Sequence, residues 1–176
     1  MLQQAHHVPL DCVTNFRRGT VVPQRLWCPK TTTDLRQYVV DAPLQMPIFF
    51  VNQDGSVGLS VNDAIEGNSL NSVWANIPAN LGGKASTHIR IAVRYKDWKR
   101  QFQTKDETSN RKPITQGKLV KHVGRSVDVF LKLQGFGESG ITHDDIIIVG
   151  IVHVSSGSWQ PILQLNRHIC LSMCGV

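Results

Sequence analysis

The sequence places a histidine beside two carboxylates in His143-Asp144-Asp145, directly before an apolar run. An imidazole and carboxylates are the groups that move protons in acid–base catalysis, and they also bind divalent metals. Aspartates are equally common as polar residues at the entry to a buried strand, and the sequence offers no matching catalytic partner. An enzyme with a site near His143 is therefore the third-ranked hypothesis, and a non-catalytic protein is favoured.

A second group of potential ligands lies near the C-terminus, where His168, Cys170 and Cys174 follow one another. Structural zinc sites combine one closely spaced ligand pair with another, and Cys12 and Cys28 are too far apart to supply the second pair. We therefore predict no metal and no cofactor. The four cysteines lie at the two ends of the chain, so the sequence does not require disulfides.

The strongest chemical signal is positive charge concentrated in one segment. The chain has 19 Lys and Arg against 13 Asp and Glu, which gives a net charge of +6. Residues 84–125 alone contain twelve basic and three acidic residues, so this segment carries +9 and the rest of the chain carries −3. Such a patch attracts phosphate or carboxylate groups, although it can also be only a solvated face. The candidate partner-binding residues are Arg90, Arg94, Lys99, Arg100, Lys105, Arg111, Lys112, Lys118 and Lys121.

Two classes of partner fit this basic segment, and the aromatic residues help to choose between them. An acidic protein surface would present carboxylates to the arginines and lysines. Nucleic acid would present phosphates, and exposed aromatic rings would stack on its bases. Tyr95 and Trp98 stand beside basic residues, but the alternation of the sequence places both on the buried side. We therefore rank an acidic protein partner first and nucleic acid second.

Composition limits the remaining classes of protein. The chain has 176 residues, 41% hydrophobic and 18% charged, which is typical of one globular domain or of a domain with an extension. The longest apolar run, residues 146–154, is too short to span a membrane, and residues 1–10 lack the pattern of a secretory signal. We expect an intracellular protein of the cytoplasm or nucleus that is not secreted and has no membrane partner.

The second half of the chain shows the clearest structural pattern. Residues 88–95 and 98–105 each alternate apolar and polar side chains, which predicts a β-hairpin turning near Lys96-Asp97. Residues 146–154 form a β-branched run that is apolar on both faces, as in a central strand, with His153 as a hydrogen-bonded core histidine. Residues 159–165 read as a return strand, and Pro161 predicts that this strand lies at an edge or bulge.

A helix is predicted between the two strand pairs. Ile114, Thr115 and Leu119 form a hydrophobic staple around a Thr N-cap, and the helix should run to about Leu133. Apolar residues recur at intervals of three and four and form one stripe. Gly117 and Gly124 interrupt this helix, and each costs roughly 1 kcal/mol against alanine, so close packing must offset them.

The first half is less regular. Residues 1–47 read as an arm with at most one helical turn, near residues 34–38, whose apolar side chains Leu26, Trp27, Tyr38, Val39 and Val40 could pack on the core. Residues 48–61 predict a β-hairpin that turns at Asp54-Gly55. A short helical turn should follow, capped by Asn62 and ended by Gly67, and then a polar connector over residues 68–83.

The order strand, strand, helix, strand, strand in residues 87–165 resembles the β-grasp, or ubiquitin-like, fold. The sequence thus predicts an α+β protein: an arm with a hairpin (1–83), a β-grasp-like sandwich (84–165) and a cysteine-containing tail (166–176). The resemblance implies binding through an exposed hairpin edge with basic residues beside it, as in β-grasp modules that bind small GTPases. The stretch 98–125 also resembles uncharacterised proteins of mushroom-forming fungi, which implies no activity.

Overall fold

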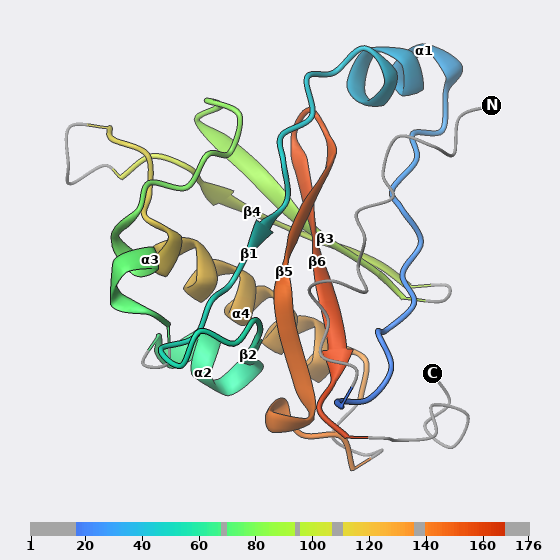
Figure 1. Ribbon diagram of the computed structural model, residues 1–176. Coiled ribbons are helices and arrows are strands. Elements are labelled where there is room, and N and C mark those ends of the chain that lie inside the picture. Colours follow the sequence, from blue (N-terminus) through green and yellow to red (C-terminus); the bar gives the residue numbers. More distant parts are fainter. Residues whose placement is uncertain (1–16, 68–69, 94–95, 107–110, 136–139, 168–176) are drawn as a thin grey trace.

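A computed structural model describes residues 17–67, 70–93, 96–106, 111–135 and 140–167, and it shows an α+β protein. One mixed sheet has the strand order β1-β5-β6-β3-β4, with β2 also paired to β5 (Figure 1). Its strands are β1 (Ile48–Phe49), β2 (Leu59–Ser60), β3 (Ser86–Val93), β4 (Lys96–Gln103), β5 (Ile146–Ser155) and β6 (Ser158–Leu165). Strands β3 and β6 are parallel, and the other pairs are antiparallel.

The predicted hairpin of the basic segment is confirmed, but its turn is displaced. Val93 pairs with Lys96, so Lys96 and Asp97 are the first residues of β4 and not the turn. Arg94 and Tyr95, which separate the two strands in the sequence, lie outside the described part of the chain. The predicted alternation in β4 holds, since Phe102 and Thr104 are buried while Gln101 and Gln103 are exposed.

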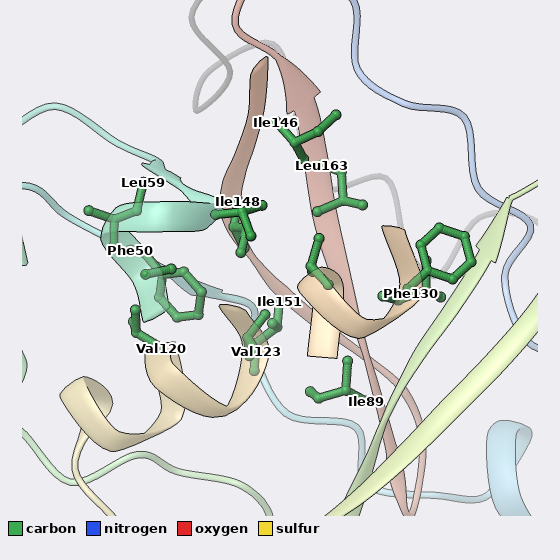
Figure 2. Close-up of a cluster of buried hydrophobic side chains, with 14 of the residues drawn as sticks. Phe50, Leu59, Ile89, Val120, Val123, Phe130, Ile146, Ile148, Ile151 and Leu163 are labelled. Carbon is green, nitrogen blue, oxygen red and sulfur yellow. The ribbon is translucent and has the colours of Figure 1, made fainter. Parts of the chain in front are cut away.

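The long helix α4 (Gln116–Leu133) begins and ends as predicted. The Thr115 hydroxyl caps it by accepting a hydrogen bond from the Lys118 backbone N–H at 3.3 Å. Its apolar stripe packs on one face of the sheet, where Val120, Val123 and Phe130 meet isoleucines of β3 and β5 (Figure 2). Val120, Val123 and Phe130 are each 1% exposed or less, so the helix and the sheet share one core.

Two glycines let short helices approach α4 closely, as the sequence required. A Cβ atom built on Gly124 would lie 2.9 Å from Cβ of Ala64 in α2 (Val61–Glu66). A Cβ atom on Gly117 would lie 3.2 Å from the Ala75 carbonyl oxygen in α3 (Ser72–Asn76). Helix α3 falls within the predicted polar connector, where no helix was expected from the sequence. Its Asn71 side chain caps it by accepting from the Val73 N–H.

Strand β5 is buried on both faces, and it is a central strand as predicted. Strand β6 is also central, so the edge position, one of the two alternatives predicted from Pro161, is wrong. The other alternative, a bulge, agrees with a register shift in the β5–β6 pair between Ile148 and Gly150, beside Pro161. Strands β3 and β6 pair only at His88–Ser158 and Ile89–Trp159, and beyond this point the N-terminal arm takes the place of β3. Pro161 lies in the gap between β3 and β6. Proline has no N–H to donate, and at this position no carbonyl of β3 requires one.

Residues 19–25 of the arm fill this split in the sheet. Gly19 and Val22 donate backbone hydrogen bonds to Leu165 and Leu163 of β6. Gln24 then bridges the gap: its Nε2 donates to the Pro161 carbonyl at 2.6 Å, and its Oε1 accepts from the Gln160 amide at 3.2 Å. The arm, drawn in blue in Figure 1, is therefore an additional partner of β6.

The hairpin predicted over residues 48–61 is present only as a turn. Val51 and Val57 pair, and Gly55 adopts φ +82° in the predicted turn. The flanking strands β1 and β2, however, lie end to end along β5 instead of pairing with each other. This arrangement gives the exposed backbone edge of β5 a partner and buries Phe50 completely. The helical turn that follows is confirmed and ends at Gly67, but Ser60 caps it instead of Asn62.

The arm contains more helix and buries less apolar surface than predicted. It holds α1 (Thr32–Leu35) and a π-helical segment, η2 (Arg36–Val40). Leu26, Tyr38 and Val40 are 58%, 39% and 49% exposed, so the prediction that they could be buried was wrong. In the described residues, no helix is long and apolar enough to cross a membrane.

Candidate functional site: the basic edge of β4

Strand β4 is the last strand of the sheet, and one of its edges has no strand partner among the described residues. The Thr104 N–H donates to the Ala85 carbonyl at 3.0 Å, and the register of the hairpin continues this pairing at every second residue. The peptide groups of the residues between those pairs therefore point away from β3. They belong to Asp97, Lys99, Gln101 and Gln103. An extended peptide can use such groups to add a further strand.

Arg90 and Lys99 face each other across the hairpin, on the face of the sheet opposite α4. Lys99 is exposed, whereas Arg90 is half-buried and already engaged. The Arg90 Nε donates to Ser158 Oγ at 3.0 Å, and its guanidinium carbon lies 4.4 Å from the centre of the Trp27 ring. Burial lowers the pKa of Arg90, and the nearby Asp97 opposes this shift. Arg90 thus connects the arm to the sheet, and Lys99 is an accessible cation on this face.

Arg100 lies on the other face of β4, next to α4, where it belongs to a group of cations around His122. The His122 ring stacks on Phe102, with 4.9 Å between ring centroids and 23° between the planes. Burial lowers the pKa of His122, and the positive charges of Arg125, Arg100 and Lys118 lower it further. His122 and Arg125 were not among the predicted site residues. His122 follows Lys118 by four residues, and Arg125 follows His122 by three, so the three residues share one helix face. This spacing was the signal available in the sequence.

Four more predicted residues lie at the far end of β4. Lys118 forms an ion pair with Asp106, and Lys105 pairs with Pro113. The Asp106 backbone N–H donates to the Lys112 carbonyl at 2.8 Å, and the Arg111 N–H donates to the Asp106 carbonyl at 3.1 Å. Arg111 has φ +58°, and both Arg111 and Lys112 are exposed. These residues extend the positive surface beyond the end of the strand.

The structure does not bring all predicted residues together. The Lys121 side chain lies over Gly67 at the end of α2 and so extends toward α2, whereas Lys118 forms its ion pair with Asp106 near the end of β4. Arg94 lies outside the described residues. The patch is therefore two surfaces beside one edge strand: Lys99 on one face, and Arg100 with the α4 cations on the other.

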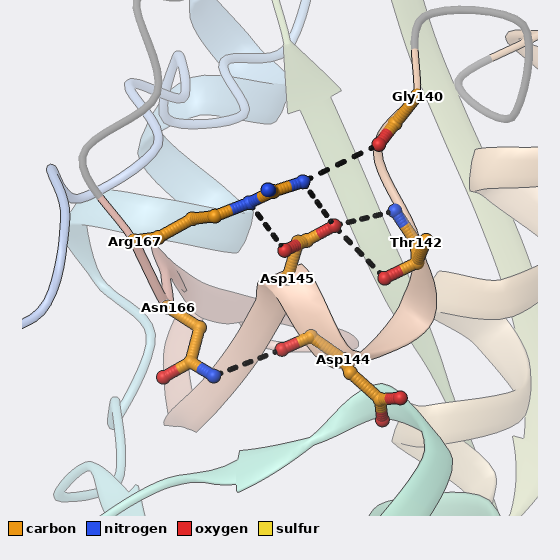
Figure 3. Close-up of polar contacts among 6 residues, drawn as sticks. All are labelled: Gly140, Thr142, Asp144, Asp145, Asn166 and Arg167. Atoms are coloured by element: carbon orange, nitrogen blue, oxygen red, sulfur yellow. Dashed lines mark hydrogen bonds and ion pairs between the residues drawn. The ribbon is translucent and has the colours of Figure 1, made fainter.

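The enzyme hypothesis placed a site at His143-Asp144-Asp145, which forms the short 3₁₀ turn η4 (His143–Asp145). The buried Asp145 carboxylate accepts hydrogen bonds from the Thr142 N–H and hydroxyl at 2.9 and 2.8 Å and from Arg167, whose Nε lies 2.7 Å away (Figure 3). Burial would raise the pKa of Asp145, but the Thr142 hydrogen bonds and the Arg167 charge outweigh it and lower the pKa. This carboxylate therefore has a structural role and stabilises the turn that precedes β5.

The other two residues of the triplet point elsewhere. His143 Nε2 lies 2.9 Å from the Asp128 carboxylate of α4, which Lys132 also approaches at 2.9 Å. In Figure 3 the Asp144 carboxylate points away from the Asp145–Arg167 pair. Within the described ranges, no three His, Cys, Asp or Glu side chains gather as a metal site.

The core histidine predicted in β5 is confirmed. His153 is 6% exposed, and its Nδ1 accepts a hydrogen bond from the Gln45 N–H at 2.8 Å. Its ring stacks on Trp159 at 4.4 Å. Trp98 is half-buried and packs against Phe130, with 6.5 Å between centroids, so it belongs to the core as predicted. Cys28 is exposed and free, and the other three cysteines lie outside the described residues.

Comparison with known proteins identifies no relative: no family model, no curated protein and no solved structure matches the chain.

Proposed function

We propose that this protein is a non-catalytic interaction module that binds an extended acidic segment of a partner protein at the edge of β4. The single observation that carries the proposal is the edge of β4 that has no strand partner in the described part of the chain, with outward peptide groups at Asp97, Lys99, Gln101 and Gln103. Strand addition to such an edge derives affinity from backbone hydrogen bonds and specificity from neighbouring side chains. The cations beside the edge favour a partner rich in carboxylates.

The charges on the two faces have a limited energetic role. Lys99 and Arg100 are exposed, so each ion pair with a partner contributes only about 0.5 kcal/mol. Backbone pairing would supply most of the affinity, and the positive potential would mainly accelerate encounter. Exposed lysines on an edge strand also oppose pairing between identical, equally basic edges. The same feature thus disfavours self-association and favours an acidic partner.

We further propose that residues 84–165 form a β-grasp-like module. Support comes from the order β3, β4, α4, β5, β6, from the helix on one face and from the parallel contact between the first and last of these strands. In this scheme β3–β4 is the exposed hairpin that β-grasp modules use for partner binding.

A display selection tests the proposal because the partner is unknown. A library of random peptides is selected against the intact protein, and the same selection is made against a Lys99→Glu/Arg100→Glu variant. The control variant, Lys30→Glu/Lys121→Glu, makes the same change in net charge at exposed positions away from the edge. We expect acidic peptides that bind the native protein and the control but not the edge variant.

Amide hydrogen exchange then separates strand addition from simple charge attraction. A selected peptide should slow exchange at the outward N–H groups of Lys99 and Gln101. Selection of no peptide, or binding without this protection, would contradict the proposal. Tighter binding of single-stranded nucleic acid at the same edge, with a steep salt dependence, would favour the alternative function.

A further inference from the structure

The two faces of β4 differ in charge. On the face away from α4, the edge carries Asp97 and Lys99, whose charges cancel, and two glutamines, Gln101 and Gln103. On the face next to α4, the charged residues of β4 are Lys96 and Arg100, both exposed cations. A strand added to β4 would therefore meet a neutral polar row on one side and a positive row on the other.

Helix α4 increases this difference. The Phe102–His122 stack and the Trp98–Phe130 contact show that α4 runs along β4, with His122 above one end of the strand and Phe130 above the other. Lys118, His122 and Arg125 recur at helical spacing and so form one stripe on this side of α4. The described charges that act on His122 are all cations, namely Arg125, Arg100 and Lys118, the last of which is paired with Asp106.

The side chains of an added strand alternate between these two environments. Building on the proposed function, we infer that the partner segment carries acidic residues at every second position, all directed toward α4. Arg100 and Arg125 receive these carboxylates. The intervening positions face Asp97, Lys99 and the glutamines, so acidic side chains gain little there, and small polar β-formers such as Thr suit them.

Defined peptides test this pattern. One peptide of about eight residues alternates Glu and Thr, and a second peptide of the same composition has its Glu residues in one block and its Thr residues in another. Both have the same net charge, so long-range attraction to the protein is equal. We expect the alternating peptide to bind about threefold to tenfold more tightly in fluorescence anisotropy, because it directs more carboxylates toward α4.

Two matched variants locate the effect. Arg125→Gln and Lys121→Gln each remove one exposed charge from α4. The two residues are one helical turn apart, but the Lys121 side chain extends over Gly67 of α2, whereas the Arg125 charge acts on His122. Arg125→Gln should weaken the alternating peptide about twofold and leave the block peptide nearly unchanged, whereas Lys121→Gln should change neither. Both residues are exposed, and thermal unfolding of each variant confirms that it folds.

The outcomes separate this inference from the proposed function. Equal affinity of the two peptides, with slowed exchange at the Lys99 and Gln101 amides, would overturn the alternating pattern and leave strand addition intact. Equal effects of Arg125→Gln and Lys121→Gln would also overturn it. Failure of both peptides to bind, together with failure of the display selection, would overturn the proposed function itself.

Discussion

His122 of α4 stacks on Phe102 of β4, and this contact sets the helix face that lies beside the free edge of the sheet. Phe102 is 7% exposed and belongs to the core, so the position of the ring beneath His122 is fixed by packing. The stack places an ionisable group among Arg100, Lys118 and Arg125. The same contact therefore links the core to the surface that we propose for binding.

The environment of His122 makes stability depend on pH. Burial and then the nearby cations lower its pKa below the ordinary 6.5, so the unfolded chain binds a proton more readily than the folded protein. This contribution to stability is fully present above pH 6.5 and is lost as the pH falls through the lower pKa of the folded state. We expect His122→Gln to flatten the decrease in the free energy of unfolding between about pH 7 and pH 5.

Urea denaturation at several pH values measures this decrease for the native protein and for the variant. The readout is the slope with pH, since the substitution also alters the stack on Phe102 and hence the absolute stability. An unchanged slope in His122→Gln would show that other groups cause the dependence.

The Asp145 carboxylate should stabilise the fold through its contacts with Thr142 and Arg167. Asp145→Ala removes the acceptor for the Thr142 N–H and hydroxyl and leaves Arg167 without its ion pair. We expect a loss of about 2 kcal/mol in the free energy of unfolding. Because its pKa is lowered in the folded state, this stabilisation is present above the ordinary value of 3.8 and is lost as the pH falls through the folded pKa.

Asp144→Ala provides the control, since Asp144 is exposed and contributes only its backbone carbonyl to the contact with Asn166. It should change stability by no more than about 0.5 kcal/mol. Similar losses in the two variants, measured by urea denaturation, would contradict the role assigned to the Asp145 carboxylate.

Gly124 should resist substitution although it lies inside a helix. Alanine gains about 1 kcal/mol in helix propensity over glycine. At this position, however, its Cβ would lie 2.9 Å from Cβ of Ala64 and 3.0 Å from the Ile65 nitrogen. Helix α2 would have to move, so we expect Gly124→Ala to lower the thermal midpoint and to cost about 1–3 kcal/mol.

Gly117→Ala is the comparison, because its nearest neighbour, the Ala75 carbonyl oxygen, would lie 3.2 Å away and α3 is a short surface helix. It should cost less than Gly124→Ala. A more stable Gly124→Ala variant would show that α2 does not depend on this close approach.

The sequence correctly predicted those helices and strands whose patterns depend only on neighbouring residues. The staple around Thr115 located the start of α4, and the alternation of residues 88–105 located the hairpin because each pattern depends on one helix face or one strand face. The basic segment, residues 84–125, could also be identified because its Lys and Arg residues are close together in the sequence. The contact of Lys121 with α2 was not predicted, because it depends on how α2 packs against α4.

Long-range pairing explains the remaining errors. Nothing near Pro161 in the sequence indicates that β3 separates from β6 there, and this separation is what permits a proline in a central strand. Similarly, β1 and β2 both pair with β5, which is far from them in the sequence, instead of with each other. His122 was missed because its role depends on Phe102 in another element. Such contacts follow from tertiary packing, and the local periodicity of the sequence does not encode them.

The split in the sheet predicts a specific dependence on Gln24. Its side chain donates to the Pro161 carbonyl and accepts from the Gln160 amide and, at 3.4 Å, from the Ala92 N–H. Gln24→Ala would remove the hydrogen bonds of the Gln24 side chain to the Pro161 carbonyl, the Gln160 side-chain amide and the Ala92 N–H. We expect the free energy of unfolding to fall by about 1–3 kcal/mol. The exposed Gln37 provides a matched control, since Gln37→Ala should change stability by about 0.5 kcal/mol or less. Urea denaturation of both variants tests whether the arm is part of the sheet: equal stabilities would mean that β3 and β6 hold together without Gln24, whereas the expected difference makes the arm a structural strand of this fold.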